Sequence, residues 1–181
     1  MSVLVLALTA LVAAPNVRAA EGDPQNTVYL DTQYGRVIIR LRPDLAPKHV
    51  EQIKTLVKRH FYDGIVFHRV IPGFMAQTGD PTGTGTGGSD LPDLPAEFTN
   101  KAKFVRGTVG MARSSDPNSA NSQFFIMFAP APFLDGQYTI FGEVVSGMDA
   151  VDKIKKGSEA DNGTVDHPDK ILKMRLATDT K

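Results

Sequence analysis

One short stretch of the sequence places a charged side chain where it could do chemistry. In the extended pattern FHRVI, side-chain alternation puts Arg69 on one face together with the apolar side chains of Phe67 and Ile71. A buried cation is costly unless it is paired or used. Arg69 is therefore either held by a carboxylate of the core, which spacing alone favours, or presents its N–H groups to a ligand.

A second stretch has the spacing of a nucleotide site. Gly83, Gly85 and Gly88 match G-x-G-x-x-G, the pattern of a dinucleotide-binding turn, which needs a strand before it and a helix after it. The following residues read SDLPDLPAEF, in which Pro92 and Pro95 stand too close together for a regular helix. No Lys-Ser or Lys-Thr pair follows the glycines, which excludes a P-loop. The glycines predict instead a surface loop that another backbone can approach closely.

The sequence offers few residues for other catalytic chemistry. It has no cysteine, which excludes disulfides, thiolate nucleophiles and cysteine-ligated zinc. Neither H-E-x-x-H nor G-x-S-x-G is present, and no two histidines have metal-ligand spacing. We therefore predict no metal and no cofactor. Among the histidines, His68 alternates away from Arg69 and is interpreted as a hydrogen-bonded core residue.

Composition limits the class of protein. With 181 residues and 41% hydrophobic content, the chain is expected to form one domain with a single core. Twenty basic residues balance 20 acidic ones, so the sequence lacks the basic patch that nucleic acid or an anionic membrane would require. Nothing in the sequence demands more than a monomer.

The first residues are typical of an export signal. The apolar run VLVLALTALVAA is too short for the roughly 20 residues of a membrane-spanning helix. Val17 and Ala19 are small residues at suitable positions before a cleavage site. We predict a signal peptide at 1–19 and a mature domain at 20–181, with no membrane contact after cleavage. No basic residue precedes the run, so translation could begin upstream, and a buried N-terminal helix is the alternative.

The hydrophobic pattern of the mature chain is mostly that of strands. TVYLDTQYGRVIIRLR predicts a hairpin over 27–42, and an apolar stripe from Val50 to Val57 predicts a helix that begins at Pro47 and ends near His60. In ILKMRLA, alternation predicts a closing strand with Leu172 facing inward. The remaining predicted elements are a helix at 148–155 and strands at 66–71, 75–78, 108–112, 123–128 and 138–145.

Three blocks of the sequence carry a family resemblance. They are YDGIVFHRVIPGFMAQTGDPTGTGTGG at 62–88, GTVGMARSSDPNSANSQFFIMF at 107–128 and FLDGQYTIFGEVVSGMDAVDKI at 133–154. In this order, from about Thr27 to Leu176, the chain resembles the cyclophilin family of peptidyl-prolyl cis-trans isomerases, and most closely the small bacterial members exported to the periplasm. The resemblance implies a mainly β fold, a closed eight-stranded antiparallel barrel capped by two helices, which agrees with the predicted strands.

The chemistry of this reaction explains the missing nucleophile. Rotation about an X-Pro bond must break amide resonance, a barrier of about 18 to 20 kcal/mol, but no covalent bond is made or cleaved. A catalyst needs an apolar socket for the proline ring and a donor aimed at the prolyl nitrogen, whose lone pair is localised only in the twisted amide.

The resemblance assigns roles to individual residues. Arg69 stands at the position of the family's catalytic arginine, and Gln77 at that of the glutamine that orients it. Without the resemblance, a stripe of Phe and Met residues would be ordinary core. The implied substrate-binding positions are the proline pocket, a segment whose backbone contacts the peptide, and a neighbouring loop: Phe74, Met75, Gln123, Phe125 and Leu134; Ala112, Arg113 and Ser114; Gly85 and Thr86.

Two positions in the pocket depart from much of the family. Phe133 stands where many eukaryotic members have tryptophan, and Tyr138 where they have histidine. Loss of the indole N–H removes a donor that those relatives use toward cyclosporin. We therefore predict weak cyclosporin binding.

The sequence thus predicts an isomerase that acts on X-Pro bonds of unfolded or newly exported polypeptides in the periplasm of a Gram-negative bacterium, and so assists folding. Proline-containing polypeptides are the expected partners. The alternative is a non-catalytic chaperone module that binds prolyl peptides in the same groove with little turnover.

Overall fold

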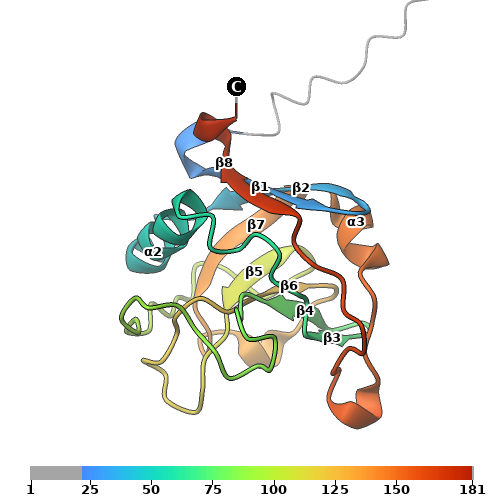
Figure 1. The fold of residues 1–181 in the computed structure, drawn as a ribbon. Helices are drawn as coiled ribbons and strands as arrows, with labels where there is room; N and C mark the ends of the chain where they lie inside the picture. Colours follow the sequence, from blue (N-terminus) through green and yellow to red (C-terminus); the bar gives the residue numbers. More distant parts are fainter. Residues whose placement is uncertain (1–21, 181) are drawn as a thin grey trace, which may run out of the picture.

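The chain folds into one antiparallel sheet of eight strands with two α-helices, seen in a computed structural model that describes residues 22–180 (Figure 1). The predicted signal peptide at 1–19 lies outside these residues. The helices are α2 Pro47–Lys58 and α3 Met148–Lys153. The strands are β1 Thr27–Thr32, β2 Gly35–Leu41, β3 Arg69–Ile71, β4 Met75–Thr78, β5 Thr108–Met111, β6 Phe124–Met127, β7 Ile140–Ser146 and β8 Lys173–Leu176.

The first hairpin forms where alternation predicted it. Strands β1 and β2 pair from Thr27 with Arg40 to Thr32 with Gly35. Gly35 turns the chain with a φ of 132°, and its carbonyl accepts a hydrogen bond from the Thr32 hydroxyl at 3.0 Å. Val37, Ile39 and Leu41 on β2 are buried and Arg40 is exposed, as the two-residue period predicts, but Ile38 on the opposite face is also buried.

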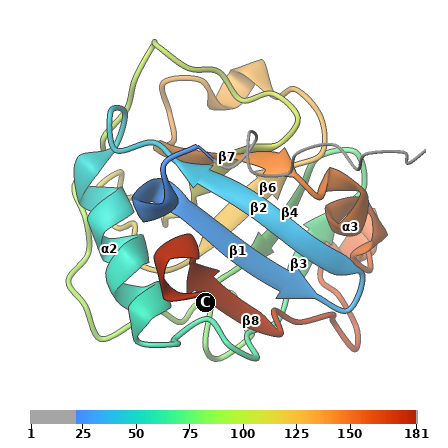
Figure 2. The same cartoon turned by 90° about the horizontal axis from the view of Figure 1, so that it is seen from above.

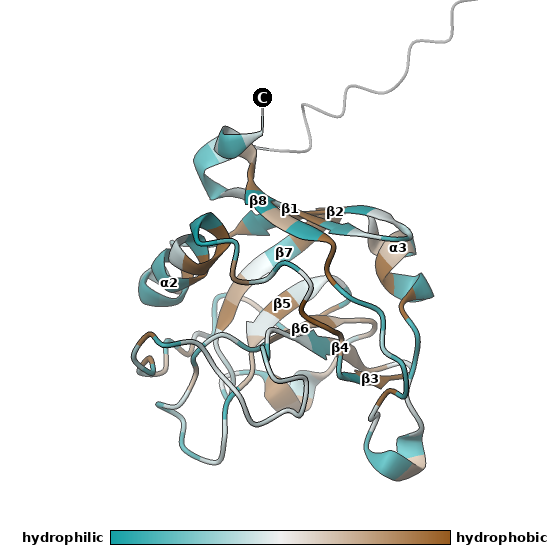
Figure 3. Ribbon diagram, in the orientation of Figure 1, coloured by the Kyte–Doolittle hydropathy of each residue, from teal (hydrophilic) through white to brown (hydrophobic). Residues whose placement is uncertain are grey.

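Helix α2 follows its predicted apolar stripe, and Figure 3 shows its hydrophobic face turned toward the sheet. Pro47 occupies the first turn, but Ala46 provides no side-chain cap. The cap comes from a distant loop, because the Glu97 carboxylate accepts the N–H groups of Lys48 and His49 at 3.2 and 3.1 Å. Glu97 thereby attaches the loop before β5 to this helix.

The sheet curls but does not close. Its strand order is β3-β4-β6-β5-β7-β2-β1-β8, and every neighbouring pair is antiparallel. The predicted closed barrel is therefore not confirmed, and the sheet forms a half-barrel that is open between β3 and β8. Along that gap, residues 64–67 and 169–171 share single hydrogen bonds and the isolated bridge between Val66 and Lys170. Just before residues 169–171, the positive φ of His167, 49°, and Pro168, which has no N–H, end the extended pairing.

Several predicted boundaries also shift. The strand expected at 66–71 contains only β3, and the helix expected at 148–155 ends at Lys153. Leu172 was predicted to face the core, but it is 46% exposed because β8 begins only at Lys173. Met174 is buried as predicted.

The interior has two parts. The larger core lies between the curled sheet and the helices, and Figure 2 shows α2 to the left and α3 to the right of strands β1, β2 and β8. A smaller cluster surrounds β4 and β6 and contains Met75, Phe125 and Leu134, with Phe74 and Tyr138 packed against it. The smaller cluster thus holds most of the residues predicted for the proline pocket.

Candidate active site

Three neighbouring strands place the predicted polar and aromatic side chains in one row. Arg69 on β3 pairs with Gln77 on β4, and Gln77 pairs in turn with Phe125 on β6. Residues that are paired across antiparallel strands point to the same face of the sheet. The register therefore brings Arg69, Gln77 and Phe125 together, although they are up to 56 positions apart in the sequence.

A hollow of about 690 Å³ opens above this row. Most of the predicted site residues line it: Arg69, Phe74, Met75, Gln77, Gly85, Ala112, Arg113, Phe125, Phe133, Leu134 and Tyr138. The three others, Thr86, Ser114 and Gln123, line an adjacent hollow of about 600 Å³. Arg113 lines both hollows, so the predicted residues form one continuous groove with two depressions.

The first hollow has an apolar floor and an aromatic rim. Met75, Phe125 and Leu134 are buried beneath it. The ring of Phe133 is 70% exposed, and its centroid lies 5.6 Å from that of Phe74. The rings of Tyr138 and Phe125 pack edge to face, with their centroids 5.9 Å apart. Such a socket accepts a small apolar ring and excludes water from one side of it.

Arg69 is fixed at the edge of this socket by neutral acceptors. Its Nη1 donates to Gln77 Oε1 at 3.1 Å, its Nε to the Asn162 carbonyl at 2.9 Å and its Nη2 to Asn162 Oδ1 at 2.9 Å. Within residues 22–180 no carboxylate pairs with it, so the hypothesis of a core ion pair is wrong. Burial lowers the pKa of the guanidinium, which still carries its charge at neutral pH.

A chain of hydrogen bonds joins Arg69 to the glycine-rich loop. Gln77 Nε2 donates to Gln123 Oε1 at 2.9 Å, and Gln123 Nε2 donates to the carbonyls of Gly85 and Gly87 at 3.1 and 2.8 Å. The loop carbonyls thus face the site, but the groups that lie against Gly83, Gly85 and Gly88 are the side chains of Val66, His68 and Asn121, so the predicted close approach of another backbone is not found there. The chain from Ser89 to the start of β5 is irregular, so no helix follows the glycines.

Asp80 organises this loop from within, and the sequence analysis missed it. The side chain is only 1% exposed. Its Oδ1 accepts from the N–H and hydroxyl of Thr82, and its Oδ2 accepts from the N–H groups of Gly85 and Gly87. Burial opposes ionisation, but the hydrogen bonds from Thr82, Gly87 and Gly85 outweigh it and lower the pKa of Asp80 to about 2. In the sequence, the signal for this role was an acidic residue that stands just before closely spaced glycines.

The segment from Ala112 to Ser114 is held by one backbone hydrogen bond and several side-chain contacts. The N–H groups of Ala112 and Ser114 donate to the Gln123 carbonyl and to Ser119 Oγ, both at 2.9 Å. The Arg113 guanidinium stacks on the Tyr138 ring, 4.4 Å from its centroid, and donates to the carbonyls of Ser114 and Gln137. A peptide backbone would therefore meet this segment at Arg113 or at a carbonyl oxygen.

His68 differs from its prediction. It lies in the wall of the socket, where a Cβ on Gly85 would stand 3.6 Å from its ring. Both ring nitrogens are buried and make no well-formed hydrogen bond within the described residues, although the Val66 backbone lies near enough to interact with the ring. Burial lowers the pKa of His68, although nearby Asp80 opposes the effect. The residue is therefore neutral at physiological pH.

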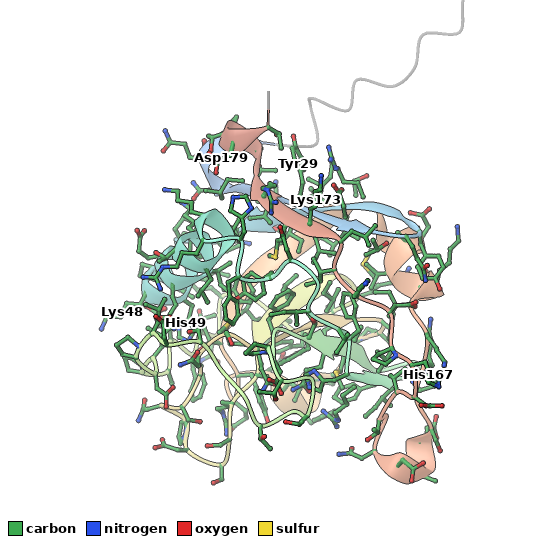
Figure 4. The ribbon with its side chains drawn as sticks, in the orientation of Figure 1. Tyr29, Lys48, His49, His167, Lys173 and Asp179 are labelled. Carbon is green, nitrogen blue, oxygen red and sulfur yellow. The ribbon has the colours of Figure 1, made fainter. Side chains whose placement is uncertain are left out.

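The titratable side chains of residues 22–180 are dispersed. No three of them are arranged to hold a metal ion. His49 and His167, for example, lie on opposite sides of the molecule (Figure 4). Neither α-helix of this region has the length and apolarity needed to cross a membrane.

Comparison with known proteins gives a consistent result. A family model described as cyclophilin type peptidyl-prolyl cis-trans isomerase/CLD matches residues 27–176, the range of the resemblance seen in the sequence. A probable peptidyl-prolyl cis-trans isomerase from Brucella suis is 64% identical over 174 residues, which cover 90% of this chain and 88% of the relative. A peptidyl-prolyl cis-trans isomerase-like 1 from Aspergillus niger is 41% identical over 158 residues, 84% of this chain and 96% of the relative.

Solved structures agree with the sequence matches. A cyclophilin from Hirschia baltica superposes with a TM-score of 0.77 at 29% identity, covering 88% of this chain and 76% of that one. A cyclophilin-type isomerase from Cryptosporidium parvum, crystallised in the presence of the dipeptide Ala-Pro, gives a TM-score of 0.75 at 30% identity. The match covers 83% of this chain and 98% of that one.

Proposed function

The chain belongs to the cyclophilin family and is a peptidyl-prolyl cis-trans isomerase, and from this we propose that it isomerises X-Pro bonds of unfolded or newly exported polypeptides and so assists their folding. We place this activity in the periplasm of a Gram-negative bacterium. The carrying observation is the position of Arg69, a charged donor held by Gln77 and Asn162 at the edge of an apolar socket.

The socket and the arginine act on different parts of the reaction. A proline ring over Met75 and Phe125 is held in an apolar surface, which favours the less polar, twisted amide over the planar one. A guanidinium N–H can then donate to the prolyl nitrogen, whose lone pair becomes available only as resonance is lost. The donor therefore stabilises the transition state more than the bound substrate.

The expected ligand is an extended prolyl peptide. The cyclophilin from Cryptosporidium parvum was crystallised in the presence of Ala-Pro, and by analogy the socket of this chain would take proline with the residue before it in the adjoining groove. The rim residue Phe133 is 70% exposed and packs only against Phe74 among the aromatic rings of residues 22–180, which favours broad acceptance of side chains. We further propose that the enzyme acts as a monomer and binds cyclosporin weakly.

Export rests on the N-terminal sequence alone. The apolar run at 3–14, with Val17 and Ala19 after it, supports cleavage after residue 19. N-terminal sequencing of the protein purified from envelope fractions should find Ala20 or Glu21 as the first residue. A mature protein that retains Met1 would contradict the proposal of export.

The catalytic role of Arg69 is tested by exchange spectroscopy on a short Ala-Pro peptide. Removing one preorganised donor typically lowers turnover roughly a hundred- to a thousandfold, and we expect this loss for Arg69→Ala with peptide affinity largely kept. Arg69→Lys should be nearly as slow, because an ammonium cannot reproduce the planar fork that Gln77 and Asn162 hold. Arg59→Ala is the matched control, since Arg59 pairs with exposed Asp90.

Two outcomes would overturn parts of this proposal. A folded Arg69→Ala protein within about threefold of the wild-type rate, a change below about 1 kcal/mol, would remove Arg69 from the mechanism. Wild-type protein that binds the peptide but does not accelerate exchange would support the chaperone module instead.

A further inference from the structure

Asn162 holds two of the three hydrogen bonds that fix the Arg69 side chain. It lies 93 positions further along the chain, in the loop that follows the 3₁₀ turn η3 (Glu159–Asp161). Its backbone carbonyl accepts from Arg69 Nε and its Oδ1 from Arg69 Nη2, both at 2.9 Å. Gln77 accepts from the remaining terminal nitrogen, Nη1, at 3.1 Å.

The hydrogen bonds to Asn162 and Gln77 leave some of the N–H groups of Arg69 unused. A guanidinium has five N–H groups in one plane. Asn162 and Gln77 occupy three of them, which leaves two, one on each terminal nitrogen, at the socket that Arg69 lines. We propose that Asn162 is a positioning residue for the isomerase reaction, which sets the plane of the Arg69 guanidinium so that its free N–H groups face the prolyl nitrogen. This inference rests on the proposed catalytic role of Arg69.

The backbone explains why asparagine suits the position. Asn162 has φ 53° and ψ 32°, the left-handed region, which asparagine tolerates better than most residues that have a Cβ. In this conformation its backbone carbonyl and its side-chain oxygen both face one guanidinium. Only asparagine and aspartate combine tolerance of this conformation with an acceptor at that distance from the backbone.

The loop is fastened directly to the strand that carries Arg69. The N–H of Val70 donates to the Gly163 carbonyl at 2.7 Å, and the N–H of Val165 donates to the His68 carbonyl at 3.1 Å. A Cβ on Gly163 would collide with the side chain of Ile71, so the glycine permits this approach. Both neighbours of Arg69 in the chain are thus bonded to the loop, and Asn162 is held rigidly beside the guanidinium.

The side chain of Asn162 can be tested separately from its backbone. Asn162→Gly can keep the left-handed conformation and the carbonyl contact, and removes the side chain together with its Oδ1 acceptor. We expect the isomerisation rate of the bound Ala-Pro peptide to fall roughly three- to tenfold, as for the loss of one hydrogen bond. Peptide affinity should stay within about twofold, because the apolar socket is unchanged. Asn162→Asp retains the acceptor and should restore the rate to within about twofold of wild type.

The control addresses the added flexibility of glycine. His167 also has a positive φ, of 49°, and its side chain is 90% exposed and does not contact Arg69. His167→Gly should therefore leave the rate unchanged. A rate for Asn162→Gly within about 1.5-fold of wild type, or a slow Asn162→Asp protein, would overturn the positioning role.

A double-mutant cycle separates this inference from the function on which it rests. If Asn162 acts through Arg69, adding Asn162→Gly to Arg69→Ala should slow the reaction no further. Equal losses in both backgrounds would overturn the positioning role while leaving Arg69 catalytic. A fast Arg69→Ala protein would instead refute the catalytic role of Arg69 itself.

Discussion

Replacement of Asp80 by asparagine should destabilise the protein in a manner that depends on pH. The carboxylate is only 1% exposed and accepts four hydrogen bonds, two on each oxygen. In Asp80→Asn one oxygen becomes an NH2 group. If the NH2 group faces Gly85 and Gly87, their N–H donors lose their acceptor. If the new side-chain amide is rotated by 180°, the N–H and hydroxyl of Thr82 lose theirs instead. Neither orientation satisfies the loop.

The pKa of Asp80 sets the magnitude. A carboxyl whose pKa falls from its ordinary value of 3.8 to about 2 contributes roughly 2 kcal/mol of stability at neutral pH, at about 1.4 kcal/mol for each tenfold change in acidity. Asparagine approximates the uncharged acid, so Asp80→Asn should lose about this amount at pH 7. For a domain of this size the melting temperature should fall by about 4 to 8 °C.

The sign of the pH dependence follows from the direction of the shift. Because the pKa is lowered in the folded state, the stabilisation is complete above the unfolded value of 3.8 and is lost as pH falls through about 2. Urea unfolding of wild type and Asp80→Asn should therefore differ by about 2 kcal/mol at pH 7 and by roughly half of that at pH 3. Asp116→Asn is the control, since Asp116 caps an exposed turn through the N–H of Asn118.

Two results would refute this reasoning. One is an Asp80→Asn protein as stable as Asp116→Asn at pH 7, which would mean that the loop does not depend on the charge. The other is a stability difference that stays constant from pH 7 to pH 3, which would assign the loss to packing rather than ionisation.

The remaining predictions concern the socket and its surroundings. Phe133→Trp should strengthen cyclosporin inhibition by up to roughly tenfold, the value of one added hydrogen bond, and an unchanged inhibition constant would mean that the position does not contact the drug. Because the proposed reaction transfers no proton and Arg69 stays charged, turnover should be nearly flat between about pH 6 and 8, and a bell-shaped profile abolished by His68→Asn would give that histidine a catalytic role. Gly110→Ala would place a Cβ 2.6 Å from the Phe104 ring and 2.7 Å from that of Phe125, and calorimetry should show a loss of about 1 to 3 kcal/mol unless the rings can move apart.

The inward faces of the main elements could largely be predicted from the sequence. Two-residue alternation in β2 and the apolar stripe of α2 predict most of the buried side chains, because side chains that share a face recur at periods of 2 and 3.6 residues; Ile38 is buried against this pattern. Alternation predicted that Arg69 shares a face with Phe67 and Ile71, but Phe67 packs in the larger core and His68 lines the socket beside Arg69, so this prediction was wrong for Phe67 and His68. Pro92 and Pro95 correctly predicted that the glycine motif opens no helix. The resemblance then supplied roles that no spacing could give.

Contacts between residues far apart in the sequence are set by the fold. The cap that Glu97 provides to α2 and the clamp that Asn162 provides to Arg69 join residues that are 48 and 93 positions apart. Whether the sheet closes depends on how segments 64–67 and 169–171 meet, and their single bonds leave it open. The periodicity of a strand or helix determines the face on which a side chain lies. The distant residue that it contacts depends instead on the curvature of the whole sheet, to which every strand contributes.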